Sequence, residues 1–324
     1  MEFTKYTSKK HTIQQIAEEL LHVTQQAAIA SYPWIGKGNK IEADGAGTKA
    51  MRHYLNKIDM CGRVVIGEGE MDEAPMLYIN EMLGSGNGPV IDIAVDPVEG
   101  TTLMSKGKNH SMAVLAAANS GSMLHAPDMY MKKIAVGPGA KGCIDLNASL
   151  KDNMLAVAKA LGKDVKELTI MIQDRDRHNH LMKQVLDLGA KLKLFSDVDI
   201  TGALATGIDG MDIDMLVGTG GAPEGVITAT ALKCLGGDFQ GQLVPMNQEE
   251  YDRCVKMGIE DPNKVLMLDE IVRTDDCLFS ATAITDGMFL NGVKKLSSGK
   301  MSTHSLLLIG ANTRNIKFIQ SYHQ

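Results

Sequence analysis

The sequence lacks the features that mark membrane, secreted and nucleic-acid-binding proteins. It contains no run of 18 apolar residues, and its amino-terminal segment has no apolar signal-peptide core. Basic residues are not in excess, because 33 Lys and Arg stand against 39 Asp and Glu. The net charge of −6 argues against binding of nucleic acid through bulk charge, but it allows a local basic pocket for a phosphorylated ligand. We therefore expect a soluble, cytoplasmic protein with no membrane and no nucleic-acid partner.

Cysteine is also scarce, and its spacing suggests no cross-link. The five cysteines are odd in number, lie far apart and form no C-x-x-C pair, so the sequence predicts neither a disulfide framework nor a zinc knuckle. We expect them to be reduced and to act as small apolar side chains. They are Cys61, Cys143, Cys234, Cys254 and Cys277.

What the sequence does contain is enough apolar material for one large core or two ordinary ones. It has 324 residues, of which 44% are hydrophobic. At about 150 residues per domain, we expect two domains, residues 1–150 and 151–324.

Hydrophobic periodicity predicts an α/β protein, with an α+β first half and a more regular α/β second half. In the first half we expect helices at 12–31, 44–56 and 75–82, and strands at 63–66, 90–95 and 112–118. In the second half we expect helices at 152–161, 177–188, from 199 onward and at 224–235, and strands at 168–172, 191–195 and 211–217. This alternation predicts a largely parallel sheet. Strands are also expected at 278–284, 305–309 and 316–319.

The most informative segment is an apolar strand that ends in acidic residues, VIDIAVDPVEGTT at 90–102. Pro97 should stop strand pairing and leave Asp96 at the end of the strand. Across the turn that follows, Asp96 and Glu99 can converge on one cation, and Thr101 lies where backbone N–H groups could bind a phosphate. The alternative interpretation is a solvated acidic turn capped by a threonine.

A second acidic loop, VVIGEGEMDE at 64–73, follows another predicted strand. Residues two apart in an extended chain share a face, so Glu68, Glu70 and Asp72 could point into one cavity. Such carboxylates repel one another unless cations or protons lie between them. Alternatively, Glu73 and Asp72 cap the helix expected from Pro75.

Two more acids stand next to glycines, Asp44 in ADGAG and Glu224 in GGAPEG. Asp44 taken alone is more simply an ordinary helix cap, and its inclusion depends on the other carboxylates. Oxygen ligands on glycine-rich loops suit Mg²⁺ or Mn²⁺, whereas zinc would favour His and Cys. These ions commonly assist reactions of phosphate esters, so the pattern predicts a metal-dependent phosphate-ester hydrolase.

Five sequence blocks resemble one family within the lithium-sensitive, metal-dependent phosphatases. The motifs DPVEGT at 96–101 and GEGE at 67–70 resemble that superfamily as a whole. The blocks KGNKIEADGA, VVIGEGEMDEAPMLYI, APDMYM, VGPGAKG and GGAPEGV resemble the class II, GlpX-type fructose-1,6-bisphosphatases of bacteria. The resemblance covers about residues 12–323. It implies hydrolysis of the 1-phosphate of fructose 1,6-bisphosphate in gluconeogenesis and a layered αβαβα sandwich of the sugar phosphatase type. Residues 1–150 would bind metal and phosphate, and residues 151–324 would bind the sugar.

The resemblance also implies roles for individual residues. Thr101 would be the catalytic hydroxyl that orients or activates the attacking water, with Glu70 and Asp72 as acid/base or third-metal groups. Mn²⁺ or Mg²⁺ would be held by Asp44, Glu68, Asp96, Glu99 and Glu224. Substrate contacts would come from Glu99, Gly100, Thr101, Tyr130, Arg175, Asp176, Arg177, Asp197, Asp199 and Gly221. We expect Arg175 and Arg177 to hold the distal 6-phosphate.

The sequence departs from the family pattern at Val198, where the family commonly has glycine between the two aspartates. A β-branched residue disfavours positive φ, so the loop must have a negative φ or be strained, and the range of sugars is open. Sedoheptulose 1,7-bisphosphate or an inositol phosphate are alternative substrates, and a catalytically silent phosphosugar-binding protein is an alternative function. We expect nearby histidines such as His178 to pack or hydrogen-bond without binding metal. The family suggests a homodimer or homotetramer.

Overall fold

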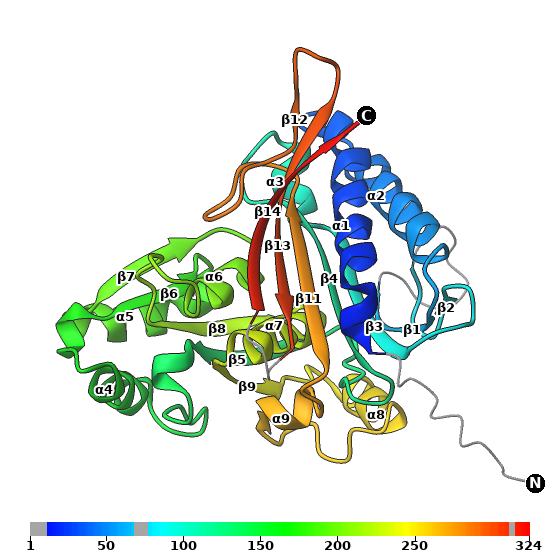
Figure 1. The fold of residues 1–324 in the computed structure, drawn as a ribbon. Coiled ribbons are helices and arrows are strands. Elements are labelled where there is room, and N and C mark those ends of the chain that lie inside the picture. Colours follow the sequence, from blue (N-terminus) through cyan, green and yellow to red (C-terminus); the bar gives the residue numbers. More distant parts are fainter. Residues whose placement is uncertain (1–11, 68–76, 311–314) are drawn as a thin grey trace, which may run out of the picture.

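The computed structural model describes residues 12–67, 77–310 and 315–324, which form two β-sheets with helices on their faces (Figure 1). In the described residues the first sheet has eight strands, in the order β2-β1-β3-β4-β11-β13, with β12 and β14 both pairing with β13. Its strands are β1 Cys61–Ile66, β2 Met82–Leu83, β3 Val90–Glu99, β4 Met112–Asn119, β11 Cys277–Ala283, β12 Lys294–Lys295, β13 Met301–Ile309 and β14 Asn315–His323.

The second sheet has six described strands, in the order β10-β9-β5-β8-β6-β7. They are β5 Tyr130–Val136, β6 Thr169–Gln173, β7 Lys191–Phe195, β8 Met215–Gly221, β9 Asp238–Leu243 and β10 Leu266–Met267. The helices are α1 Ala17–Ser31, α2 Lys40–Leu55, α3 Thr101–Ser105, α4 Leu150–Leu161, α5 Asn179–Asp187, α6 Asp199–Ala205, α7 Ala222–Leu235, α8 Gln248–Lys256 and α9 Leu268–Ile271. No helix within the described ranges is long and apolar enough to cross a membrane.

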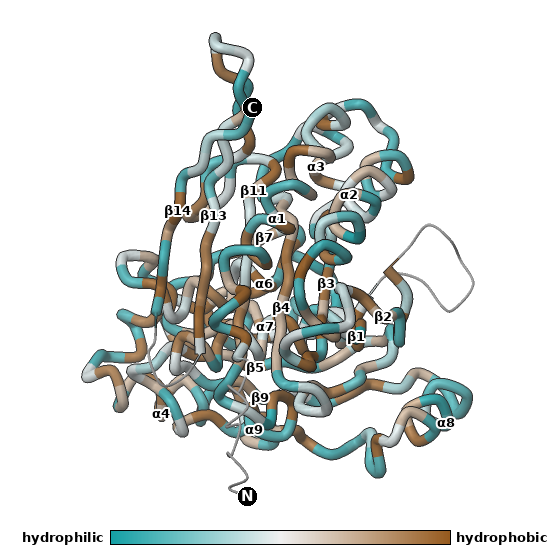
Figure 2. Tube along the Cα trace, turned by 45° about the vertical axis from the view of Figure 1, so that its right-hand side comes forward, coloured by the Kyte–Doolittle hydropathy of each residue, from teal (hydrophilic) through white to brown (hydrophobic). Residues whose placement is uncertain are grey.

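The layers follow the order αβαβα, as the resemblance implied. Helices α1 and α2 pack on one face of the first sheet, and α4 and α5 pack on the outer face of the second. Between the sheets, α6 and α7 share a single buried core with the inner faces of both. Figure 2 shows β3 and β4 largely in the hydrophobic colour, because each is covered on both faces.

The second sheet is mixed, so the prediction of a largely parallel sheet was wrong. Among its described strands, only the β6 pairings with β7 and β8 are parallel. Strands β5 and β9, which the sequence analysis did not predict, pair antiparallel within it. The expected boundary near residue 150 does not separate the sheets either. β5 precedes it but belongs to the second sheet, and β11 to β14 follow it but complete the first.

Most predicted elements are present, but three in the first half differ from the prediction. The helix expected at 75–82 is absent from residues 77–82, where the chain turns and then forms β2. Leu77 is buried before this turn, and Leu83 is the buried residue of β2, which pairs with β1. The first strand of the acidic motif runs to Glu99 instead of ending at Asp96, and the helix expected from residue 44 begins earlier, at Lys40.

Candidate active site

The acidic turn after β3 is built on a bulge. Asp96 and Glu99 both remain paired with β4, but the register shifts between them, so Pro97 lies in a position where the missing N–H costs no ladder bond. The Asp96 Oδ1 accepts a hydrogen bond of 2.9 Å from the backbone N–H of Val98. We expected from the sequence that Pro97 would stop the strand, and this prediction was wrong. The strand continues past Pro97 through the bulge, which brings both carboxylates to its carboxyl end.

Gly100 and Thr101 form the next turn. Gly100 adopts a left-handed conformation with φ of 78°, and Thr101 begins the short helix α3. The Thr101 hydroxyl donates a hydrogen bond of 2.7 Å to the carbonyl of Val98. A Cβ at Gly100 would lie 2.8 Å from the Cγ2 of Val198, so the glycine also makes room for a loop from the second sheet. The turn at Gly100 and the loop that follows β7 thus meet at this point.

Buried carboxylates gather beside this turn. Burial raises the pKa of Glu99 well above its usual range, and the Asp96 carboxyl, with which it shares a hydrogen bond, raises it further. Glu224 and Asp199 contribute in the same direction. Burial also raises the pKa of Glu224 to about 7, against the opposing charge of Lys133. These four carboxyl groups therefore share one poorly solvated region.

The donor chemistry of this region fits a hard divalent cation. The buried Oε2 of Glu224 accepts no hydrogen bond from any described residue, and Gly221 leaves the space it occupies. No three Asp, Glu, His or Cys side chains of the described chain are positioned to hold a metal as they stand. The predicted ligand Glu68 and the predicted catalytic residues Glu70 and Asp72 lie outside the described residues. Carboxylates that repel one another in a buried region favour a bound cation, and their oxygens suit Mg²⁺ or Mn²⁺.

Asp44 lies inside helix α2, and it is not the helix cap. The cap is Asn39, whose side chain accepts a hydrogen bond of 3.2 Å from the N–H of Glu42. Gly47, one turn after Asp44, packs closely against the bulge, where a Cβ would lie 3.2 Å from the Pro97 carbonyl. Because residues three apart share a helix face, Asp44 lies on the side of α2 that approaches the acidic turn.

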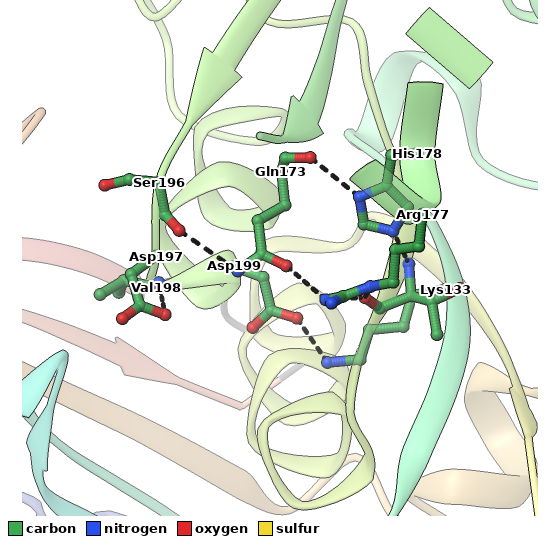
Figure 3. A network of polar contacts seen from close by, with 9 residues as sticks. Lys133, Gln173, Arg177, His178, Ser196, Asp197, Val198 and Asp199 are labelled. Atoms are coloured by element: carbon green, nitrogen blue, oxygen red, sulfur yellow. Dashed lines mark hydrogen bonds and ion pairs between the residues drawn. The ribbon is translucent and has the colours of Figure 1, made fainter. Parts of the chain in front are cut away.

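Lys133, a buried lysine close to Asp199 and Glu224, was not predicted from the sequence. It lies on β5, 2% exposed, and its Nζ donates a 2.5 Å hydrogen bond to the Oδ2 of Asp199. Figure 3 shows this ion pair between the start of α6 and β5. One signal was available: in the segment MKKIA, alternation places Lys133 on the same face as the apolar Met131 and Ala135.

The predicted sugar-binding residues on the second sheet are partly brought together. Tyr130 pairs with Gly221 across β5 and β8, and the Arg177 guanidinium lies 5.2 Å from the centre of the Tyr130 ring. The Nη2 of Arg177 donates to the Gln173 Oε1 at 2.8 Å and to the Thr219 carbonyl at 2.7 Å. Arg175 and Asp176 are exposed on the adjoining turn.

The loop with the two aspartates directs them to different surroundings. Asp199 faces Lys133, whereas Asp197 and Val198 line a cavity of about 400 Å³ together with His110. The sequence left two alternatives for this loop, a negative φ at Val198 or a strained conformation. Val198 has a φ of 71° and is 2% exposed, so the strained conformation is the one that occurs.

Comparisons with known proteins agree with these observations. The family model described as bacterial fructose-1,6-bisphosphatase, glpX-encoded, matches residues 14–323. A protein of Escherichia coli (strain K12) named fructose-1,6-bisphosphatase 1 class 2 is 44% identical, with 95% of each chain covered. A class 2 fructose-1,6-bisphosphatase of Haemophilus influenzae is 43% identical, covering 95% of this chain and 96% of its own. A protein of Synechococcus sp. (strain JA-3-3Ab) named D-fructose 1,6-bisphosphatase class 2/sedoheptulose 1,7-bisphosphatase is 43% identical, with 94% of each chain covered.

Proposed function

The chain belongs to the family of bacterial, glpX-encoded fructose-1,6-bisphosphatases, and from this we propose that it hydrolyses the 1-phosphate of fructose 1,6-bisphosphate in gluconeogenesis. The products are fructose 6-phosphate and inorganic phosphate. The observation that carries the proposal is the family match over residues 14–323. The chain is thus a phosphoric monoester hydrolase.

We assign the chemistry to the acidic turn and the residues around it. Bound Mn²⁺ or Mg²⁺ would polarise phosphate oxygens and lower the pKa of a bound water. The ligands would be Asp44, Glu68, Asp96, Glu99 and Glu224. The Thr101 hydroxyl would orient the attacking water at the 1-phosphate, and Glu70 and Asp72 would move its proton. The buried, mutually repelling carboxyl groups support this assignment, because a cation would relieve their repulsion.

The sugar and its distal phosphate would bind between the acidic turn and the carboxyl ends of β6 and β8. Arg177, stacked on Tyr130, would hold the 6-phosphate, with Arg175 and Asp176 beside it. Sugar hydroxyls would contact Asp197 and Asp199, and the backbone at Gly221 would line the site. The contact between Val198 and Gly100 supports a site shared by these two loops.

Sedoheptulose 1,7-bisphosphate is a second candidate substrate. The observation in its favour is that the Synechococcus relative carries both activities in its name. We further propose a cytoplasmic homodimer or homotetramer, on the basis of the family resemblance. Size-exclusion chromatography with light scattering would test the assembly, and a monomer at micromolar concentration would contradict it.

The first test is a phosphate-release assay with Mn²⁺ or Mg²⁺ on fructose 1,6-bisphosphate, sedoheptulose 1,7-bisphosphate and inositol monophosphate. The wild-type protein should hydrolyse fructose 1,6-bisphosphate, whether or not it also hydrolyses sedoheptulose 1,7-bisphosphate. Binding of the sugar without phosphate release under any divalent cation would instead support a silent phosphosugar-binding protein.

The second test is Thr101→Ala, which should lower kcat by about 10²- to 10⁴-fold while the protein stays folded. Thr101→Ser keeps the hydroxyl and should retain most of the activity. Thr102→Ala is the matched control, because it removes the neighbouring hydroxyl, which binds Lys40 at 2.6 Å and is not assigned to the reaction. Normal turnover by Thr101→Ala would refute the proposed role.

A further inference from the structure

His178 lies between β6 and β8 at the point where these parallel strands separate. The strands are paired over residues 170–171 and 215–216. If that register continued, one of the following ladder bonds would join the Thr219 N–H to the Gln173 carbonyl. The imidazole occupies that place instead: its Nδ1 lies 2.8 Å from the Gln173 oxygen (Figure 3), and its Nε2 accepts the Thr219 N–H at 2.8 Å. One side chain thus replaces one backbone hydrogen bond of the sheet.

These two partners fix the tautomer of the ring. A carbonyl only accepts and an N–H only donates, so Nδ1 carries the hydrogen and Nε2 is the free acceptor. The ring is 1% exposed and lies against Gly218, where a Cβ would come within 3.2 Å of its Cε1. Burial lowers the pKa of His178, which agrees with a neutral ring. The position therefore requires a planar group with one donor and one acceptor on opposite sides.

The same two residues, Gln173 and Thr219, also position Arg177, through other groups. Its Nε and Nη2 donate to the Thr219 carbonyl at 3.0 and 2.7 Å, and its Nη2 also binds the Gln173 side chain. Residues 177 and 178 therefore bind the carbonyl and the N–H of Thr219 respectively. Any movement of His178 would shift Thr219, and with it the guanidinium stacked over Tyr130.

We propose that His178 is a positioning residue for substrate binding, an inference that rests on the function proposed above. By replacing a rung of the ladder, its neutral ring holds the carboxyl ends of β6 and β8 apart at the width of an imidazole. The gap holds Arg177 in the orientation that binds the phosphate remote from the cleaved bond. The hydrogen bonds of His178 go to Gln173 and Thr219, and we assign it neither to the reacting phosphate nor to the acidic turn, so its removal should weaken binding of that distal phosphate and leave the chemical step intact.

The test compares His178→Gln with His178→Leu in the complete protein with Mn²⁺. Glutamine offers an acceptor and a donor at similar reach, whereas leucine offers neither. For fructose 1,6-bisphosphate, the leucine variant should raise KM about tenfold or more with kcat within about twofold, and the glutamine variant should restore most of the loss. For fructose 1-phosphate, which lacks the distal phosphate, both variants should match the wild type. His180→Gln, an exposed histidine on α5, is the control.

A second pair of measurements guards against misfolding and against failure of the proposed function. Gly218→Ala crowds the ring from the other strand and should also raise the KM for fructose 1,6-bisphosphate. Titration of fructose 6-phosphate by calorimetry, which needs no turnover, should show weaker binding to His178→Leu than to the wild type.

If the wild type turns over fructose 1,6-bisphosphate but His178→Leu leaves its KM unchanged, only the positioning role is overturned. Equal losses on both substrates, carried by kcat, would also overturn it. Absence of wild-type turnover would instead refute the proposed function.

Discussion

Val198 combines an unfavourable backbone conformation with a buried side chain. A left-handed conformation costs a non-glycine residue about 1–2 kcal/mol, and β-branching adds to the crowding. Its φ of 71° is held by packing, because the side chain is buried in the core between the sheets and touches Gly100. Val198 therefore links the loop after β7 to the turn at Gly100 at the expense of local strain.

Substitutions at Val198 should reverse the usual order of stability. Val198→Ala loses apolar contact but keeps most of the strain, whereas Val198→Gly loses slightly more contact and relieves the strain. We expect glycine to be the less destabilising of the two by about 0.5–1 kcal/mol in urea unfolding.

The control for this prediction is Val114, which is equally buried but lies in the extended strand β4. There, glycine should be the more destabilising substitution, because a strand disfavours it. The same order at both positions would mean that Val198 is not strained.

Glu224 should make the metal-free protein less stable as the pH rises. Its pKa is about 7 in the folded chain against an ordinary value near 4.5, so between these values the folded state holds a proton that the unfolded state has lost. The stabilising contribution of the Glu224 proton is fully present below about pH 4.5 and is lost as the pH rises through 7. The free energy of unfolding should fall by at most about 3 kcal/mol over this range.

Urea unfolding from about pH 5 to 8 without divalent cations would check this. Glu224→Gln, which cannot ionise, should show a smaller fall, and Mn²⁺ should restabilise the wild type near neutral pH. An equal fall in the free energy of unfolding with pH for the wild type and Glu224→Gln would contradict the prediction.

At the scale of elements, helix α2 and the bulge of β3 depend on a close approach at Gly47. A Cβ at this position would lie 2.9 Å from both the Ser31 hydroxyl and the Cγ2 of Val98. This contact sets the distance between α2, which carries Asp44, and the bulge, which carries Asp96 and Glu99. The geometry of the candidate metal site is therefore set by helix packing as well as by its ligands.

Two glycines of α2 provide a matched comparison. Gly45→Ala meets no atom within 4 Å and should raise the free energy of unfolding by about 0.5–1 kcal/mol, because alanine favours the helix. Gly47→Ala should lower it by about 1–3 kcal/mol through overpacking, and should weaken Mn²⁺ binding measured by calorimetry. Equal effects of the two substitutions would refute a specific role for Gly47.

At the scale of the whole molecule, the chain enters the second sheet after β4 and returns to the first at β11 (Figure 1). The two sheets also share the central core through α6 and α7. Neither half of the chain can therefore complete its own sheet. We expect this interleaving to couple the folding of the two sheets.

Calorimetry of the metal-free protein should accordingly show one unfolding transition, with similar calorimetric and van't Hoff enthalpies. Fragment 1–150 lacks β11, the strand that pairs with β4, and should not fold alone. Two resolved transitions, or a folded fragment, would support the division of the chain near residue 150.

The sequence by itself determined the chemistry and most of the local structure. These features depend on residues that are neighbours in the chain. The carboxylates on glycine-rich loops and the DPVEGT motif predicted a divalent-metal phosphatase, and the alternation of apolar residues predicted elements such as β4 and β7. The tertiary structure decided what depends on distant contacts. Pro97 is accommodated because β4 continues across the bulge, and Val198 is held in its strained conformation by the central core. Lys133 is buried because Asp199 approaches it from another element, and His178 enters the sheet because β6 and β8 separate there. In each case the conformation is stabilised by contacts with residues far away in the sequence, and no local pattern of residues specifies those contacts.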